Sequence, residues 1–388
     1  MMSFDFKLAF RLVRKSLFAG SQTDARLTRR RLTAMMIHFP FYVVNQTING
    51  FCLLLDEIIF PGYHDTTIED PVFIVGFPRS GTTYIHRLMA KDEQFTTIRF
   101  WEIVFAPSIT QKIIFKALGR LDRRLGNPVS SGIRKWEQAK FKKSYHPIGF
   151  FEPEEDDGIL MHIFSSFFLI FMFPFYEELR PLARFDLELS ATDRRRIMDF
   201  YKRCVQRHLF VFGKGGKKFL SKNPAFSTRV QSLQDTFPDA HVVCMVRNPL
   251  ESIPSEISHR FFWIENFYSP TSPHSVRDYV MDMARDYYRY PLSQLPKWPD
   301  SRQAIVPYPV LVKYPDKTLQ SLYKRFGFTI SKPFKDELIK NQQNTSGYQS
   351  QHEYSPEKAG LEREKILVEY QDIFEKFAFD REITSRFP

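Results

Sequence analysis

The sequence predicts an α/β fold in which a parallel sheet is flanked by helices, with a helical extension at the N-terminus. Three observations point to this class. A short apolar, β-branched run at 72–75 leads into a glycine-bounded loop and then into a helical pattern. A second apolar run at 241–246 is also followed by a helical segment, and a third strand candidate lies at 304–312. Strands that alternate with helices are typical of a parallel sheet.

The remaining elements are expected in chain order. Residues 1–70 form the helical extension, and 110–145 read as a basic helical region. Residues 158–175 contain no Asp, Glu, Lys or Arg. We expect a buried helix there rather than a membrane span, because the stretch contains polar residues and has acidic flanks. Ser190 begins an S-x-x-D capping signal for a helix to about residue 209, and 219–221 form a short strand.

Composition is that of an ordinary globular protein, with 388 residues, 43% hydrophobic and 26% charged. We divide the chain into the extension, 1–70, and one domain, 71–388. The net charge of +11 suggests an anionic partner, such as a nucleotide or a membrane surface. No nucleic-acid partner is expected. Three widely spaced cysteines, and an N-terminus without an uninterrupted apolar segment, indicate a reducing, cytoplasmic location.

The N-terminal segment has an amphipathic pattern, because Phe6, Phe10, Val13 and Leu17 recur at helical spacing. Such a helix can lie on an anionic bilayer as a peripheral contact. The alternative, which we prefer at this point, is that this apolar face packs on the core of the protein itself.

The loop after the first strand is the most informative segment of the chain. Its spacing, G-x-x-x-x-G-T-T from Gly76 to Thr83, is one residue away from the ATP-binding G-x-x-x-x-G-K-[ST]. Backbone N–H groups and a helix N-terminus favour a phosphate group there. The sequence therefore predicts a P-loop-type sheet. Because the lysine for the β/γ-phosphates is missing, triphosphate chemistry is not expected. Arg79 lies inside the loop and can bind an anionic group with its guanidinium.

A second anion-binding pattern follows the strand at 241–246. Arg247 lies at the end of the strand, Asn248 and Pro249 suit the first positions of a helix, and Ser255 follows Arg247 by eight residues. Ligands of open α/β sheets bind at the carboxyl ends of the strands, so Arg247 is expected at the ligand edge. The alternative is an ordinary salt bridge at the end of a strand.

Together, PRSGTT after one strand and R-x-P-x₅-S after another resemble the sulfotransferases that use 3′-phosphoadenosine 5′-phosphosulfate (PAPS). The resemblance covers about residues 71–330. The PRSGTT variant, the pair Trp101-Glu102 and the sequence Lys222-Asn223-Pro224 are most similar to the branch shared by bacterial-type and tyrosylprotein sulfotransferases. The resemblance implies sulfuryl transfer from PAPS to a hydroxyl group, with 3′,5′-ADP as product and no metal.

The resemblance also implies roles for individual residues. Arg247 and Ser255 would hold the 3′-phosphate, and Lys222 would lie near the bridging oxygen of the sulfate. Tyr84 matches an aromatic residue near the adenine, although it could equally be a packing residue on the helix face. The residues implied to hold the 5′-phosphosulfate are Arg79, Ser80, Gly81, Thr82 and Thr83.

The acceptor hydroxyl must lose its proton to a base. Glu102 is the first candidate, because it lies about where the tyrosylprotein branch carries its catalytic glutamate. Its alternative role is a helix cap or a salt bridge. His146 is the second candidate and the pair Glu154 and Glu155 the third, although their acidic block could also be a solvated loop.

The 40 phenylalanines, many of them in 151–175 and 260–268, suit a hydrophobic acceptor such as a lipid alcohol or another greasy small molecule. They suit a filled core equally well. Two other functions remain open: a P-loop nucleotide kinase, and a binding scaffold without catalysis. Residues 352–361 also resemble a C-terminal signature of the family, which could close over the nucleotide.

Overall fold

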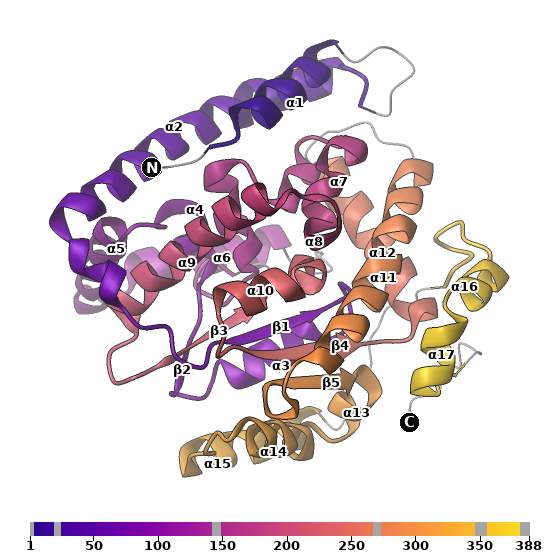
Figure 1. The fold of residues 1–388 in the computed structure, drawn as a ribbon. Helices are drawn as coiled ribbons and strands as arrows, with labels where there is room; N and C mark the ends of the chain where they lie inside the picture. Colours follow the sequence, from indigo (N-terminus) through magenta and orange to yellow (C-terminus); the bar gives the residue numbers. More distant parts are fainter. Residues whose placement is uncertain (1–3, 19–24, 142–148, 267–272, 346–354, 381–388) are drawn as a thin grey trace.

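The computed structural model of the protein describes residues 4–18, 25–141, 149–266, 273–345 and 355–380. Its centre is a sheet of five parallel strands in the order β2-β3-β1-β4-β5 (Figure 1). The predicted α/β fold is therefore confirmed. The strands are β1 (Val72–Gly76), β2 (Phe95–Thr96), β3 (Lys218–Lys222), β4 (His241–Val246) and β5 (Gln303–Pro307).

Alternating side chains of β1 enter two separate cores. Phe73 and Val75 pack in the larger core, and Val72 and Ile74 pack in the smaller one. All five residues of β1 are buried, as expected for a parallel strand covered on both faces. The end of β1 is thus fixed from both sides, which positions the loop that follows.

Helices cover both faces of the sheet. The larger core packs against α9 (Ala191–Phe212), α10 (Val230–Thr236), α11 (Pro249–Asn266) and α12 (Pro273–Gln294). The smaller core packs against α3 (Thr82–Met89), α13 (Tyr308–Lys313), α14 (Pro315–Phe326) and α15 (Lys332–Thr345). The other helices are α4 (Phe100–Phe105), α5 (Ile109–Arg124), α6 (Pro128–Phe141), α7 (Tyr176–Ala183), α8 (Phe185–Glu188), α16 (Arg363–Glu369) and α17 (Gln371–Phe377).

The N-terminal helices α1 (Phe6–Phe18) and α2 (Arg29–Ile59) form an outer layer along the top of Figure 1. Helix α1 packs on the larger core through Leu8 and Leu12. The preferred interpretation of its apolar face holds for Val13, which packs beside this core, but not for Phe6 and Phe10, which are 74% and 71% exposed. Within the described residues, no helix has both the length and the apolar character that a bilayer crossing requires.

The apolar stretch 158–175 does not form the single helix that we expected. It contains two short 3₁₀ helices, η2 (Asp156–Ile163) and η3 (Phe167–Phe171), separated at Phe164, which has a φ of 55°. The carboxylate of Asp157 accepts hydrogen bonds from Ser166 Oγ at 2.5 Å and from the backbone N–H of Phe167 at 3.0 Å. These bonds hold the chain in a turn, which competes with a continuous helix.

The third predicted strand, 304–312, is also shorter than expected. Strand β5 ends at Pro307, and residues 308–313 form helix α13. Pro309 lies in the first turn of α13, where its fixed φ and missing N–H are tolerated.

The predicted helix cap at Ser190 is confirmed. The Ser190 hydroxyl accepts a hydrogen bond from the N–H of Asp193 at 3.1 Å, and the helix, α9, continues to Phe212.

Gly76 is required where β1 passes β4. Its φ is 130°, and a Cβ atom there would lie 2.2 Å from the backbone oxygen of Met245. We expect Gly76→Ala to lower the free energy of unfolding by about 3 kcal/mol or more, measured by urea denaturation. Gly132→Ala is the matched control, since nothing lies within 4 Å of a Cβ there. In helix α6 this change should stabilise the protein by about 0.5–1 kcal/mol, and equal effects of the two variants would contradict the assignment.

Candidate active site

The loop between β1 and α3 leaves the start of the helix open. Gly81 is the N-cap residue of α3, with a φ of 88°, and it provides no side-chain hydrogen bond to the helix. A Cβ on Gly81 would lie 2.5 Å from Cδ2 of Tyr308, so only glycine fits between the loop and that ring. Because the first N–H groups of a helix have no partner within the helix, they can bind an anion at this place.

Ser80 gives a second indication that the loop fits an anion. Its side chain is fully buried. Its hydroxyl lies near that of Tyr288, but it has no hydrogen-bond partner of normal geometry among the described residues. Leaving a buried hydroxyl without a partner costs about 1–3 kcal/mol. A bound oxyanion would accept its hydrogen bond, so the residues of the loop fit the phosphosulfate group that the sequence predicts.

The two sequence motifs meet at Arg79. Its Nε donates a hydrogen bond to Ser255 Oγ at 3.1 Å, and its carbonyl oxygen accepts one from Nη1 of Arg247 at 3.0 Å. The meeting follows from the sheet, because β1 and β4 are parallel neighbours whose carboxyl ends reach the same edge. Asn248 caps α11 as predicted, since its side chain accepts from the N–H of Leu250 at 2.9 Å.

Arg247 has the salt bridge that the sequence left as an alternative. Its Nη2 lies 2.7 Å from Oε2 of Glu251, one turn further along α11. The guanidinium also lies over the ring of Tyr308, 4.4 Å from its centroid. Its side chain remains 19% exposed at the edge of the loop. Tyr84 is half-buried and packs beside the smaller core, which agrees with the packing alternative for that residue.

Lys222 ends β3 next to Ile74 of β1 and is fully buried. Its Nζ lies 2.9 Å from Glu155 and 3.2 Å from Glu154. Burial favours the neutral amine, but the two carboxylates outweigh it and raise the pKa of Lys222. The alternative of a solvated acidic loop is therefore wrong, because the acidic segment folds over the buried lysine.

The structure places Glu102 in a buried ionic cluster. One carboxylate oxygen accepts from the N–H of Arg99 at 3.2 Å, and the other lies 2.8 Å from His208 Nδ1 and 3.8 Å from Lys112 Nζ. Burial alone would raise the pKa of Glu102, but His208 and Lys112 lower it. None of these three partners is a predicted nucleotide ligand, and the role of base stays a prediction. His146 lies outside the described residues.

His259 was missed by the sequence analysis. It lies one helical turn after Ser255 on α11, which puts the two side chains on the same face of the helix. Its Nδ1 lies 3.3 Å from Oε2 of Glu256, and its Nε2 accepts from the indole N–H of Trp263 at 2.9 Å. Glu256 is held in turn by an ion pair with Arg260. The spacing of Ser255 and His259 in a predicted helix is the signal that could have found it.

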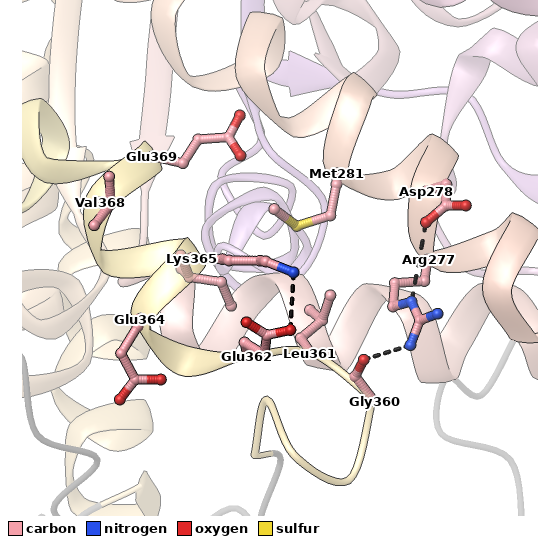
Figure 2. Close-up of a pocket in the computed structure, with 11 residues that line it drawn as sticks. Arg277, Asp278, Met281, Gly360, Leu361, Glu362, Glu364, Lys365, Val368 and Glu369 are labelled. Carbon is pink, nitrogen blue, oxygen red and sulfur yellow. Dashed lines mark hydrogen bonds and ion pairs between the residues drawn. The ribbon is translucent and has the colours of Figure 1, made fainter.

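A pocket elsewhere in the molecule does not belong to this site. Figure 2 shows it between α12 and the segment 360–369, where Arg277 donates to the carbonyl of Gly360. None of the predicted nucleotide ligands lines it. Four acidic residues in its lining, Asp278, Glu362, Glu364 and Glu369, outnumber the basic Arg277 and Lys365, which does not suit an anionic nucleotide. The part of the 352–361 signature that the structure describes thus borders a different cavity.

Comparison with known proteins identifies the family. Residues 71–332 match the model of the sulfotransferase family. The omega-hydroxy-beta-dihydromenaquinone-9 sulfotransferase Stf3 of Mycobacterium tuberculosis is 27% identical to this chain over 314 residues, which are 75% of this chain and 72% of the relative. The protein of the same name from Mycobacterium bovis gives the same values.

Two solved structures share the fold. Sulfotransferase STF1 from Mycobacterium tuberculosis superposes with a TM-score of 0.71 at 18% identity, over 95% of this chain and 92% of that one. Sulfotransferase STF9 from Mycobacterium avium gives a TM-score of 0.68 at 15% identity, over 99% and 98%. With the family match covering the strands and the loop described above, the chain belongs to the sulfotransferase family and is an enzyme that transfers a sulfuryl group.

Proposed function

We propose that the enzyme transfers the sulfuryl group of PAPS to the hydroxyl group of a hydrophobic acceptor. The observation that carries the donor assignment is the meeting of two anion-binding elements at Arg79, with Ser255 and Arg247 as its partners. In this proposal Arg247 and Ser255 bind the 3′-phosphate. The 5′-phosphosulfate is bound by Arg79, Ser80, Gly81, Thr82 and Thr83.

Sulfuryl transfer is a displacement at sulfur, and by analogy with phosphoryl transfer the protein mainly positions the reactants and stabilises charge. The acceptor oxygen forms a bond to sulfur, and the bond from sulfur to the 5′-phosphate breaks with its electron pair leaving on 3′,5′-ADP. Arg79 and Lys222 would stabilise that negative charge by a few kcal/mol each, which is about the value of one donor in a dry site. Lys222 is charged for this role, because Glu154 and Glu155 raise its pKa.

Binding of 3′,5′-ADP tests the donor assignment. At a hundred times its Kd, the nucleotide should stabilise the wild-type protein by about 2.7 kcal/mol in EDTA, measured by thermal denaturation. In Arg247→Ala most of this stabilisation should be lost, because the 3′-phosphate loses its guanidinium. The response to 5′-AMP, which has no 3′-phosphate, should be nearly the same in both proteins.

Three results would contradict this proposal. An equal loss for 3′,5′-ADP and 5′-AMP would mean that Arg247 supports the fold and not the 3′-phosphate. Stabilisation by ATP with magnesium alone would favour a nucleotide kinase. Nucleotide binding without any transfer would favour a binding scaffold.

Besides His146, which lies outside the described residues, and the pair Glu154 and Glu155, which bind Lys222, two residues are candidates for the base. Glu102 has the position expected from the family resemblance, but its carboxylate is 2% exposed and already paired. We infer that His259 is the better placed group, because its ring lies close enough to Arg79, a proposed ligand of the 5′-phosphosulfate, for their charges to interact, and its side chain is 19% exposed. The Nε2 atom would take the proton of the acceptor hydroxyl after exchanging the hydrogen bond of Trp263 for one from the acceptor. The carboxylate of Glu256 accepts a hydrogen bond from Nδ1 of His259, which favours the tautomer with its proton on Nδ1 and a free lone pair on Nε2.

The pH profile distinguishes the two bases. Burial lowers the pKa of His259, which must be neutral to act, so kcat should fall as the pH drops through a value below 6.5. A Glu102 base, whose pKa is also lowered, would already be ionised and would give a flat profile above pH 5. We expect His259→Gln to reduce kcat about 10²-fold or more while 3′,5′-ADP binding is kept. Glu102→Gln is the matched variant, and a loss confined to it would assign the base to Glu102.

A hydrophobic acceptor is supported by the side chains around His259. Phe168, Phe171 and Trp263 are half-buried, and the rings of Phe171 and Trp263 lie 6.4 Å apart. They join the segment η3 to α11, the helix that also carries Ser255 and His259. The relative Stf3 is named for a menaquinone-derived hydroxyl acceptor, which agrees with a lipid alcohol here.

Chain length of the acceptor provides the test. With labelled PAPS, kcat/KM should rise along a series of primary alcohols from butanol to dodecanol, because each buried CH₂ contributes about 0.8 kcal/mol. Sugars of similar size should be poor acceptors. A kcat/KM that is independent of chain length, or that is higher for sugars, would rule out a hydrophobic acceptor.

We further propose that the transfer domain is 71–388 and that the helices of 1–70 bring it to a membrane in a reducing, cytoplasmic environment. A lipid alcohol is concentrated at such a surface, and a peripheral contact would give the enzyme access to it. The exposed apolar side chains of α1 support this proposal.

A further inference from the structure

Helix α2 carries a row of exposed apolar side chains, here called the apolar ridge. Successive members are separated mostly by three or four residues, so they share one side of the helix. Each is between 52% and 77% exposed. The buried residues of α2, including Leu53 and Asp56, lie on the other side and contact the body of the protein. The ridge consists of Ile37, Phe41, Val44, Ile48, Phe51, Ile58 and Ile59.

Two neighbouring helices extend this surface. Helix α1 adjoins the start of α2, where Nη2 of Arg31 donates to Ser16 Oγ at 3.3 Å. Helix α5 adjoins its end, where Asp56 accepts from the N–H of Ile109 at 2.7 Å. Both add exposed apolar side chains: Phe6, Phe10 and Phe18 from α1, and Ile114, Leu118 and Leu121 from α5, with Leu125 at its C-cap. Figure 1 shows α1 and α2 together on the outside of the molecule, away from the sheet.

So many exposed apolar residues on three adjoining helices are unusual for a protein without a partner, because contiguous apolar patches on soluble proteins are small. The pattern differs from that of a helix spanning a bilayer, which no helix among the described residues matches. An apolar side on a helix that packs by its other side is typical of a segment lying in the plane of a membrane interface.

The charges of the surface favour a negatively charged partner. Residues 6–18 and 25–55 contain no Asp or Glu, and besides the buried Arg31 they carry Lys7, Arg11, Arg14, Lys15, Arg26, Arg29 and Arg30. The two acidic residues near the end of α2, Asp56 and Glu57, both pair with Arg207. Glu178 pairs with Arg11 and Lys15, but it comes from α7. Helix α5 adds the exposed basic residues Lys116, Arg120, Arg123 and Arg124. A symmetric pairing with a second copy would bring basic helices together, which disfavours self-association.

We propose that α1, α2 and α5 form a docking surface for an anionic phospholipid bilayer. The apolar ridge enters the acyl boundary while the basic side chains contact the headgroups. The inference rests on the proposed function in one respect: docking would bring the enzyme to its lipid acceptor. The docking itself is a property of the surface and can be tested without the reaction.

Vesicle binding tests the surface. The full-length protein is sedimented with phosphatidylcholine vesicles that contain or lack phosphatidylglycerol. Binding should require phosphatidylglycerol and weaken as salt is raised, because salt screens exposed charges. The double variant Ile48→Gln/Phe51→Gln should bind the vesicles at least about tenfold more weakly, because two apolar side chains no longer move from water into the membrane. Val368→Gln is the matched control, because Val368 is 76% exposed but lies on α16, outside this surface.

Each outcome separates this inference from the proposed function. Binding that is unchanged in the double variant, or that is equal without phosphatidylglycerol, would overturn the docking surface. A wild-type dimer in light scattering that the double variant abolishes, with no vesicle binding, would assign the ridge to a second copy. Transfer to dodecanol in detergent should be the same in the wild type and the double variant. Its absence in both, with vesicle binding intact, would overturn the proposed acceptor and leave the docking surface standing.

Discussion

The site depends on the two hydrogen bonds that join the loop after β1 to the start of α11. Arg79 donates to Ser255 with its side chain and accepts from Arg247 with its carbonyl group. Both bonds require that β1 and β4 end at the same level, which the parallel register from Val72 and His241 to Gly76 and Met245 ensures. Because glycine at position 76 lets the two backbones approach closely, the loop is held against β4 before any ligand arrives.

Buried charges around this junction are balanced by one acidic segment. Glu154 and Glu155 pair with Lys222, and Asp157 lies 3.0 Å from Arg229. A buried charge is tolerated only when it is paired and hydrogen-bonded. The segment therefore does two things: it keeps Lys222 charged beside the loop, and its hydrogen bonds to Ser166 and Phe167 shape the aromatic turn near α11. In the proposed site, the donor side and the acceptor side are thus both supported by the same few carboxylates.

The outer layer of the molecule has a different character from the sheet. Helices α1, α2 and α5 bury one side against the larger core or against each other, and leave an apolar, basic side in contact with solvent. A sulfotransferase whose acceptor is greasy must extract it from a lipid phase, and the apolar ridge offers a surface for that contact. The proposed lipid acceptor and the proposed docking surface therefore agree with each other, although they rest on different side chains, the aromatic cluster beside His259 and the exposed residues of the outer helices.

The sequence by itself determined the local units. The strand–loop–helix at 72–89, the strand at 241–246 with its Asn248 cap, and the Ser190 cap were all predicted, because each depends on neighbours in the chain. Only the tertiary structure decided which polar groups are buried together. Glu102 meets His208 from 106 residues away, and Lys222 meets Glu155 from 67 residues away, so no local pattern could assign their partners. The exposed side of α1 had the same cause: an amphipathic pattern gives the two sides of a helix, but the packing of α1 through Leu8 and Leu12 decides which side faces solvent.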